Sequence, residues 1–554
     1  MNNLQLRIFP FLIFAFFLCS CHSYKHPDFS KKDVRKAQKM IGLDFSKDAI
    51  DTMYHYLGRN TDGYDTLRKY QLNNETSPAL IFDPHPDGFN IPKDQDSLNW
   101  SQIPQTDLPE DLDQLAYFSI RQLADLIKSR KITSEALTKI FIGRIRKYDS
   151  SLHSVTEITE QLAISQARRA DEEIAAGNYK GLLHGIPYGV KDLIAVKGYK
   201  TTWGAEPYKN QMIDYTASVI QKLDKSGAVL IAKLSSGALA RGDVWYGGKT
   251  KNPWDITQGA SGSSAGPGAA TAAGLVAFSL GTETLGSIVS PSNRCGLTGL
   301  RPTYGRVSRY GVMSLSWSMD KVGPMCKNAD DCAIVFEAIR GIDEKDRTTK
   351  KAAFNYKTSE KKLADLRVGY LKEAFDRDST VTGKNNQKAL KTLTSLGLHP
   401  EAVSFPDNFP FAVFDIILRA ESGAFFDELV RSNKVDKMVQ QNQRSRANSL
   451  RQSRFIPAVE YLQANRHRKI LIEKIHEIFQ NYDLIISPTF GGRQLMITNL
   501  TGHPALAVPT GFDDNGRPTS VTFLGNLYEE GILLEVADSF QQQTNYEGQV
   551  PPGF

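Results

Sequence analysis

Residues 259–291 read GASGSSAGPGAATAAGLVAFSLGTETLGSIVSP. The first half of this stretch is almost entirely Gly, Ala and Ser, and Glu283 is its first charged residue. Such a composition lets the backbone approach another segment or a ligand closely, and it presents hydroxyls and amide N–H groups. Two of its serines, Ser263 and Ser287, are separated by 24 positions. We expect these two serines to take part in acyl-transfer chemistry.

A serine nucleophile needs a base that removes its proton, and no histidine lies in this stretch. Upstream, Lys191 stands in the apolar frame GIPYGVKDLIAV. A lysine can act as a base when it is neutral, and burial favours the neutral form. We therefore predict that Lys191 is the base. The alternative is a surface lysine paired with Asp192.

The sequence around Ser287, TETLGSIVSP, predicts a tight turn that presents backbone N–H groups to an oxyanion. The alternative is a structural turn between a buried strand and a loop. A competing motif lies close by, because Gly262 to Gly266 match G-x-S-x-G and would make Ser264 a nucleophile. That motif requires a preceding apolar strand, which WDITQGAS at 254–261 does not supply.

Short strand-like runs alternate with helical patterns along most of the chain, which predicts an α/β fold. Helix-start signals are Ser119 with Gln122, and Thr133 or Ser134. Further helices are expected at 163–176, 411–430 and 458–479, and strands at 186–190, 229–232, 276–280, 368–371, 484–486 and 506–508.

The chain begins with a segment that resembles an export signal. Residues 8–18 form an apolar run that is short for a membrane span but suits a signal peptide. The following Leu-Cys-Ser-Cys resembles the lipobox of bacterial lipoproteins, so residues 1–20 would be removed and Cys21 would carry lipid. We expect a membrane-anchored protein that faces the periplasm or the cell exterior. Ordinary signal cleavage or an uncleaved anchor are the alternatives.

We interpret residues 22–110 as an N-terminal extension that precedes a catalytic domain at 118–554. Ser30 and Asp33 signal a helix start, and a second helical pattern ends at Gly58. Several prolines follow, and they indicate a linker without regular helices or strands. We assign no chemistry to this extension.

Composition argues against several functions. The formal charge of +6 is small for 554 residues and is spread along the chain, so we expect no nucleic-acid partner. Only Cys295, Cys326 and Cys332 follow the signal, which is too few for a disulfide framework. No HExxH motif or Cys/His cluster occurs, and we expect neither a metal nor another cofactor.

From about residue 118 to the C-terminus, the chain resembles the amidase signature family of serine hydrolases. The resemblance rests on GIPYGVKD, SGSSAGPGAATAAG, GTETLGSIVSPSNRCGLTGLRPTYGRVS, VGPMCKNADDC and NLTGHPALAVPTG. It implies an α/β/α sandwich with a central mixed, twisted sheet. By this resemblance Lys191 is the base, Ser263 the bridging serine after a cis peptide bond, and Ser287 the nucleophile. The oxyanion-hole amides would come from Thr284, Leu285, Gly286 and Ser287.

The family implies hydrolysis of small-molecule or peptide amides through an acyl-enzyme. Two positions depart from its common pattern, since Leu285 replaces a glycine and Val289 a frequent arginine, and both border the expected substrate pocket. One alternative is the glutaminase-like A subunit of a tRNA-dependent amidotransferase, against which the export signal argues. Another is a lipoprotein that binds ligands with a retired enzyme fold, against which the retained Lys and Ser residues argue.

Overall fold

The computed structural model describes residues 28–70, 72–76, 78–96, 98, 100, 105–357 and 362–554. The chain divides into two compact units, Met1–Asn73 and Asn74–Phe554. In the described residues, no helix has the length and apolar character needed to cross a membrane.

The smaller unit contains two helices, α1 (Lys31–Met40) and α2 (Lys47–Leu67), which pack against each other. Ser30 and Asp33 form the expected capping box at the start of α1. The expected end of the second helix at Gly58 is wrong, because Gly58 is buried within α2 and the helix continues for nine residues beyond it. A glycine costs a helix only about 1 kcal/mol, so a buried one does not have to end it.

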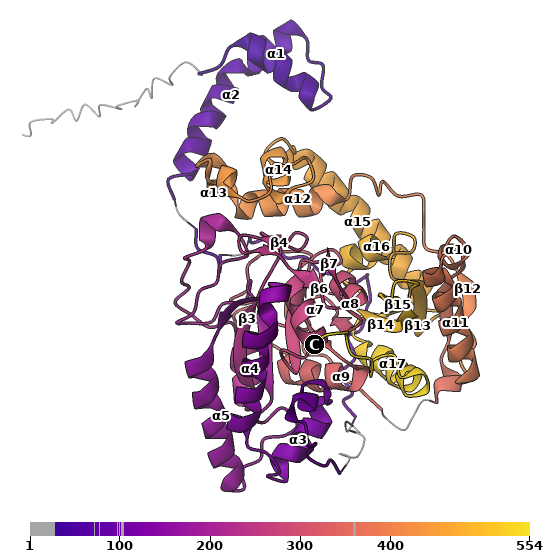
Figure 1. Cartoon of the computed structure of the whole chain (residues 1–554). Coiled ribbons are helices and arrows are strands. Elements are labelled where there is room, and N and C mark those ends of the chain that lie inside the picture. Colours follow the sequence, from indigo (N-terminus) through magenta and orange to yellow (C-terminus); the bar gives the residue numbers. More distant parts are fainter. Residues whose placement is uncertain are drawn as a thin grey trace, which may run out of the picture. The chain divides into compact units, whose positions relative to one another are not determined.

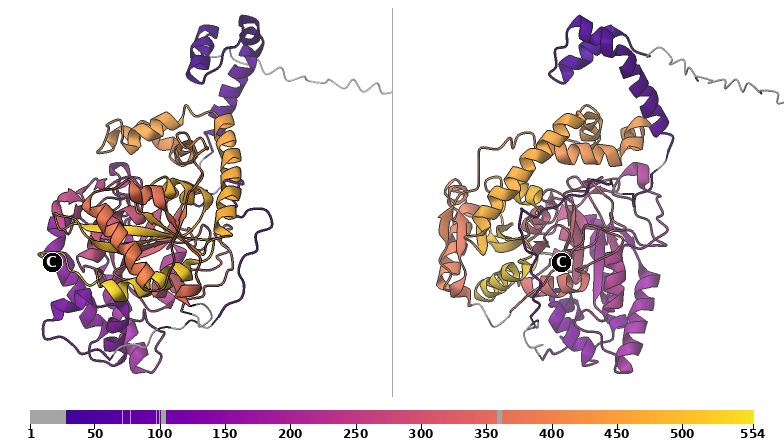
Figure 2. Two further views of the ribbon diagram at one scale, coloured as in Figure 1. Left: turned by 90° about the vertical axis from the view of Figure 1, so that its right-hand side faces the viewer. Right: turned by 180° about the vertical axis from the view of Figure 1, so that it is seen from behind.

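One mixed sheet of eleven strands crosses the larger unit, with helices on both sides (Figures 1 and 2). This confirms the predicted α/β fold. In sheet order the strands are β1 (Val155–Ile158), β3 (Val229–Leu234), β2 (Pro187–Lys191), β8 (Phe278–Glu283), β10 (Lys321–Cys326), β9 (Thr298–Arg301), β14 (Ala505–Phe512), β15 (Pro518–Gly525), β13 (Leu484–Pro488), β11 (Val368–Leu371) and β12 (Glu401–Val403).

Strand β2 pairs in parallel with both β3 and β8. Its residues are all buried, as expected for a strand covered on both faces. Tyr188 lies opposite Phe278 in the register, and their rings stack with centroids 5.2 Å apart. Because β2 and β8 run parallel, their carboxyl ends meet at one edge of the sheet. Lys191 ends β2 there, and Glu283 ends β8.

The two faces of the sheet carry different helices. Met325 and Cys326 are neighbours in β10, so their side chains point to opposite faces. Met325 packs with residues of α7 (Ala265–Ala272) and α8 (Val289–Cys295). Cys326 instead faces Cys332 of α9 (Ala329–Ile339), which packs with α17 (Glu530–Thr544). Helix α7, which directly follows Ser263 and Ser264, therefore covers the face opposite to α9.

The remaining helices surround this core (Figure 1). They are α3 (Ile120–Lys128), α4 (Ser134–Leu152), α5 (Glu160–Ala175), α6 (Ser218–Lys225), α10 (Lys372–Asp376), α11 (Val381–Ser395), α12 (Asp415–Phe425), α13 (Asp427–Arg431), α14 (Arg446–Ser453), α15 (Ala458–Phe479) and α16 (Gln494–Thr501). Helix α12 packs against α14 and α15. The helix expected at 411–430 is thus two helices, with a break at Phe426.

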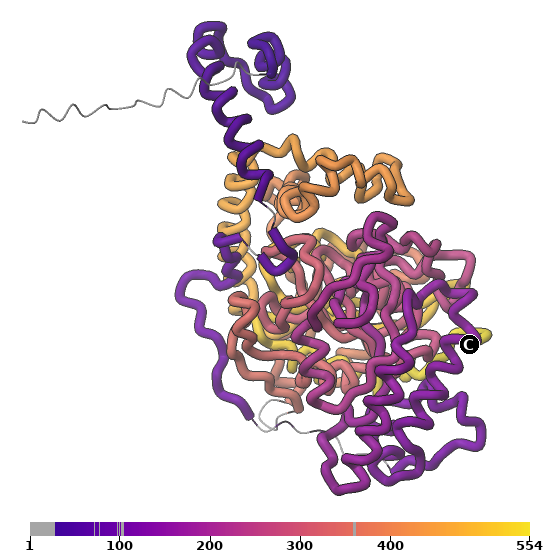
Figure 3. Tube along the Cα trace, turned by 90° about the vertical axis from the view of Figure 1, so that its left-hand side faces the viewer, coloured from indigo at the N-terminus to yellow at the C-terminus, as the bar shows by residue number. Residues whose placement is uncertain are grey.

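Part of the expected linker lies along the outside of the larger unit (Figure 3). The ring of Phe82 meets Tyr304 edge-to-face at 5.0 Å and lies under the guanidinium of Arg468 at 3.5 Å. Further along, the carbonyl of Pro92 accepts a hydrogen bond of 2.9 Å from the Ala353 amide. Through these contacts, residues 78–96 pack against the rest of the larger unit.

Candidate active site

Lys191 lies at the carboxyl end of β2 and is completely buried. Its Nζ lies 2.8 Å from Ser263 Oγ, 3.0 Å from Ser264 Oγ and 2.9 Å from Thr282 Oγ1. It also lies 3.3 Å from the carbonyl oxygen of Thr282 in β8. The lysine is therefore surrounded by hydroxyls and a carbonyl.

Burial lowers the pKa of Lys191 well below its ordinary value of 10.5, although the charges of Asp320 and Glu283 oppose this effect. The lysine is not paired with Asp192, because that carboxylate binds Lys233 Nζ at 2.8 Å in a fully buried ion pair. The surface alternative for Lys191 is therefore wrong, and the neutral form needed for a base is favoured.

Ser263 lies immediately before α7, and the peptide bond from Gly262 to Ser263 is cis. The side chain is 1% exposed, and its Oγ is within hydrogen-bond distance of Lys191. The preceding glycine has no room for a side chain, since a Cβ at Gly262 would overlap the carbonyl oxygen of Gly242. The Ser263 carbonyl accepts a hydrogen bond of 3.2 Å from the Gly237 amide.

Ser264, the nucleophile of the competing motif, is fully buried. Its Oγ accepts a bond of 3.1 Å from the Thr282 amide and donates to the Thr282 carbonyl, also at 3.1 Å. A strand does precede it, β7 (Asp255–Gly259), but with the sequence DITQG it is not the apolar strand that the motif requires. That strand belongs to a two-stranded hairpin with β6 (Lys251–Asn252) and is partly exposed, so it is no central strand leading to an exposed elbow.

Ser287 lies in the turn between β8 and α8 and is 8% exposed. Its carbonyl accepts a bond of 3.2 Å from the Ser264 amide, which brings the two serine segments together. Gly286 has φ +88°, and a Cβ there would lie 3.0 Å from Ser290 Oγ, so the turn favours glycine. Leu285 is 36% exposed. The amides of residues 285–287 donate no hydrogen bond to the described residues, which leaves them available to an oxyanion.

The buried carboxylate of Glu283 fixes the far side of this turn. It accepts hydrogen bonds from the amides of Ile288 at 2.8 Å and Val289 at 3.0 Å. Its other oxygen accepts from Arg301 Nη1 and Asn499 Nδ2, both at 2.8 Å. Burial alone would raise the pKa of Glu283, but Arg301 and the Val289 amide outweigh it and hold the pKa at about 2.

A second carboxylate supports the near side of the turn. Asp320 accepts a bond of 2.5 Å from Thr284 Oγ1 and bonds from the amides of Leu315 and Ser316 at 2.7 and 2.9 Å. Ser316 Oγ in turn donates to Glu421 of α12 at 2.6 Å. This chain of bonds connects the helical region around α12 to the turn that holds Ser287.

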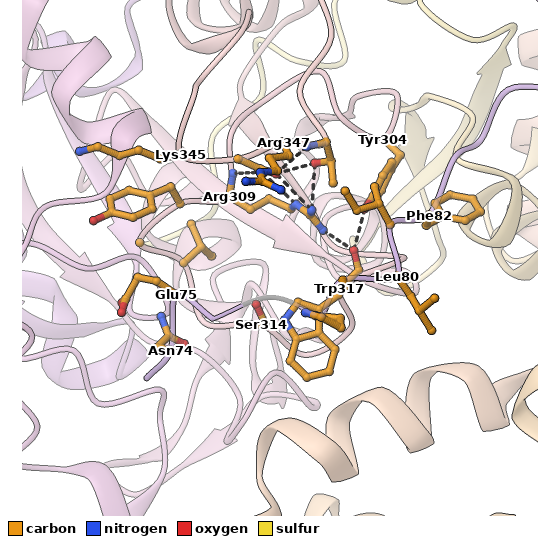
Figure 4. A pocket seen from close by; sticks show the side chains of 18 of the residues that line it. Asn74, Glu75, Leu80, Phe82, Tyr304, Arg309, Ser314, Trp317, Lys345 and Arg347 are labelled. Atoms are coloured by element: carbon orange, nitrogen blue, oxygen red, sulfur yellow. Dashed lines mark hydrogen bonds and ion pairs between the residues drawn. The ribbon is translucent and has the colours of Figure 1, made fainter. Parts of the chain in front are cut away.

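A cavity of about 490 Å³ is lined in part by this supporting loop (Figure 4). Ser314 and Trp317 of the loop form part of its wall, together with Glu75, Leu80 and Arg309. Lys191, Ser263 and Ser287 do not line it. The chemistry of the two serines therefore belongs to a different place in the fold.

The predicted site residues divide into three groups. Lys191 and Ser263 are in direct contact, and the turn that carries Thr284, Leu285, Gly286 and Ser287 adjoins them. Cys21 lies outside the described residues. In the part of the chain that the structure describes, no group of His, Cys, Asp and Glu could hold a metal ion.

Sequence reasoning missed the residues that support the site. Thr282, Asp320 and Arg301 hold the lysine or the turn, yet they come from separate strands and loops. Glu283 gave a signal, as the first charge in a long uncharged stretch. Thr282, Asp320 and Arg301 gave no such signal in the sequence.

The chain is similar to known proteins over most of its length. Residues 136–498 match the Amidase family. The A subunit of the glutamyl-tRNA(Gln) amidotransferase of a Nostoc species is 32% identical over 477 residues, covering 77% of this chain and 98% of that protein. The native peptide amidase of Stenotrophomonas maltophilia superposes with a TM-score of 0.71 at 26% identity, covering 80% and 99%. The A subunit of the Thermotoga maritima glutamyl-tRNA(Gln) amidotransferase gives 0.66 at 26%, covering 81% and 99%.

Proposed function

Because the chain belongs to the amidase family, whose members act on amides, we propose that it hydrolyses carboxamide C–N bonds through a Ser287 acyl-enzyme. The observation that carries this proposal is the buried Lys191, with its Nζ 2.8 Å from Ser263 Oγ. A lysine kept neutral by burial is a base, and in this proposal Ser263 relays its action to Ser287.

The reaction begins when neutral Lys191 takes a proton from Ser263, which takes one from Ser287. The Ser287 oxygen attacks the amide carbon, and the carbonyl oxygen becomes an oxyanion. Lys191 and Ser263 then return a proton to the leaving amine as the C–N bond breaks. Water attacks the ester and releases the acid, with the same residues moving the proton.

The free amides of the turn supply the oxyanion hole. Residues 285–287 have N–H groups without partners among the described residues, and Glu283 and Asp320 fix the turn from both sides. Such preorganised donors each contribute about 10²–10³-fold to the rate.

Purified protein tests the proposal with a library of amides, read by release of ammonia or amine. We expect Ser287→Ala to abolish turnover and to prevent covalent labelling by a fluorophosphonate. Ser165→Ala, which changes an exposed serine of α5, is the matched control and leaves both unchanged. Full turnover by Ser287→Ala would refute the mechanism.

A second candidate is the A subunit of a tRNA-dependent amidotransferase, favoured by relatives of that name at 32% identity over nearly their whole length. We place it second because the lipoprotein-like start of the chain and Val289 differ from what that role requires. In an amidotransferase this subunit works with partner subunits in the cytosol. A reporter fused to residues 1–25 distinguishes the two functions, since only an exported amidase would carry the reporter out of the cytoplasm.

We also propose that the protein is a lipoprotein with Cys21 as the modified residue, facing the periplasm or the cell exterior. The support is the apolar run followed by Leu-Cys-Ser-Cys. Cells fed a labelled fatty acid should label the protein, and Cys21→Ser should abolish the label and move the protein out of the membrane fraction. Cys19→Ser, two positions away, is the control. Unchanged labelling of Cys21→Ser would exclude this anchor.

A further inference from the structure

A buried arginine lies against the loop that supports Ser263. Arg446, the first residue of α14, is 5% exposed. Its Nε donates to the carbonyl of Leu239 at 3.0 Å, and its Nη2 donates to the carbonyl of Ala240 at 3.1 Å. Its third nitrogen, Nη1, is buried and has no hydrogen-bond partner among the described residues. A guanidinium with one unused donor in a buried place is able to bind a further anion.

Two other buried arginines have carboxylate partners, and Arg468 uses all three of its nitrogens on a hydroxyl and two carbonyls. Arg301 binds Glu283 at 2.8 Å, and Arg306 binds Glu530 at 3.3 Å, with all four side chains completely buried. For Arg446 and its neighbour Arg241, the described residues provide no ion pair. Burial and the like charge of Arg241 lower the pKa of Arg446 to about 9, while the Asp320 charge opposes them.

The charge of Arg241 is affected by one carboxylate, Asp415 of α12, but that group is already paired with Arg419 at 3.0 Å. An unpaired charge in the interior, such as that of Arg446, is costly, and proteins normally satisfy it with a partner, whereas Arg241 is exposed. The two guanidinium groups thus form a positive site without a protein counterion among the described residues.

This positive site adjoins the proposed catalytic residues. Arg241 lies in the loop 237–243, which contacts the serine segment at both ends. The Gly237 amide donates to the Ser263 carbonyl, and Gly242 leaves no room for a side chain at Gly262. Asp320, whose charge raises the pKa of Arg446, belongs to the loop that supports the turn before Ser287. Arg446 itself contacts the loop 237–243 through the carbonyls of Leu239 and Ala240.

We propose that the substrate is an amide that carries a free carboxylate, which Arg446 Nη1 and Arg241 bind beside the scissile bond. This inference rests on the proposed amidase function and names its substrate class. A guanidinium offers planar paired donors that match a carboxylate, and charge-assisted bonds of this kind are stronger than neutral ones. Arg446 is held by two backbone carbonyls, so it is oriented before the substrate arrives.

Paired substrates test the proposal. Succinic acid mono-4-nitroanilide and butyric acid 4-nitroanilide differ by a carboxylate in place of a methyl group on the acyl side. N-butyryl-4-aminobenzoate and butyranilide differ by a carboxylate on the amine side. We expect kcat/KM to be at least about tenfold higher for the charged member of one pair. Equal values in both pairs, with turnover that depends on Ser287, would overturn this inference and leave the amidase function intact.

Substitutions test the two arginines directly. Arg446→Met and Arg241→Met should each reduce the charged-to-neutral ratio of kcat/KM by about tenfold or more. The ratio is the readout because a loss of folded protein lowers both values equally. Arg444→Met removes an exposed charge two residues from Arg446 and is the matched control, for which we expect the wild-type ratio. If Arg446→Met does not fold, Arg241→Met decides, because Arg241 is exposed. An unchanged ratio would refute the proposal.

A binding measurement covers the case in which none of the four amides is turned over. Butyrate should slow fluorophosphonate labelling of Ser287, whereas the neutral isostere butyramide should not, and Arg241→Met should remove the difference. Equal protection by both compounds would overturn the inference. The absence of any labelling at Ser287, together with no turnover of any amide, would instead refute the proposed function itself.

Discussion

Replacing Glu283 by glutamine tests whether one buried carboxylate shapes the turn that carries Ser287. The Glu283 side chain is completely buried and accepts bonds from two backbone amides, Arg301 and Asn499. Glutamine keeps the size but loses the charge and turns one acceptor into a donor. Arg301 would then be a buried cation without its anion, a change that costs about 3–5 kcal/mol.

The pKa of Glu283 gives a second route to this magnitude. Its fall from the ordinary 4.5 to about 2 corresponds to about 3 kcal/mol of stability. Because the folded pKa lies below the unfolded one, this stability is present above pH 4.5 and is lost as the pH falls towards 2. The two routes agree on a loss of about 3 kcal/mol or more at pH 7 for Glu283→Gln.

Urea unfolding at pH 7 and amide hydrolysis at saturating substrate measure the two consequences. We expect a lower unfolding midpoint, and a kcat reduced more than KM is changed, because the turn acts on the oxyanion. Glu373→Gln, which alters an exposed glutamate of α10, should change stability by less than about 0.5 kcal/mol. If Glu283→Gln retained the wild-type midpoint and kcat, the argument that Glu283 organises the turn would be wrong.

Three further predictions concern the lysine and the serine segment. Lys191→Met should abolish turnover yet raise the urea midpoint at pH 7. The reason is that below pH 10.5 the unfolded chain binds a proton that the folded chain does not, at a cost of about 1.4 kcal/mol for each pKa unit. In the wild type, kcat/KM should rise with pH as the lysine loses its proton, and a maximum near pH 5 would contradict a lysine base. Gly262→Ala should lower both the melting temperature and kcat, because its Cβ would overlap Gly242, whereas Gly143→Ala in α4 has open space and should be neutral or stabilising.

The sequence predicts local elements well where one short pattern decides them. Strand β11 has the bounds expected from the sequence, Val368–Leu371, and so does helix α15, Ala458–Phe479. Apolar runs and helical spacing are properties of neighbouring residues, so they can be read without a fold. Elements such as β10 and β15 are not evident in the sequence, because all their residues are buried but Lys, Gly, Pro, Ser and Thr interrupt the apolar run.

The site is predictable only in part for the same physical reason. The motifs around Lys191, Ser263 and Ser287 carry their own signal, whereas the groups that tune them are brought in by the fold. Arg444 and Arg446 stand two residues apart in QNQRSRANSL, and nothing in the sequence distinguishes them. In the structure Arg444 lies before α14 and is exposed, whereas Arg446 begins the helix and is buried against Leu239 and Ala240.

A neutral lysine requires that nearby carboxylates do not stabilise its charged form. Both Glu283 and Asp320 lie close enough to raise the pKa of Lys191, yet burial still dominates. Each carboxylate also accepts hydrogen bonds elsewhere, from Arg301 for Glu283 and from Thr284 and two amides for Asp320, although burial still raises the pKa of Asp320. The same bonds fix the turn before and after Ser287. The two carboxylates thus shape the oxyanion hole through hydrogen bonds, and their partners limit the field that would protonate the base.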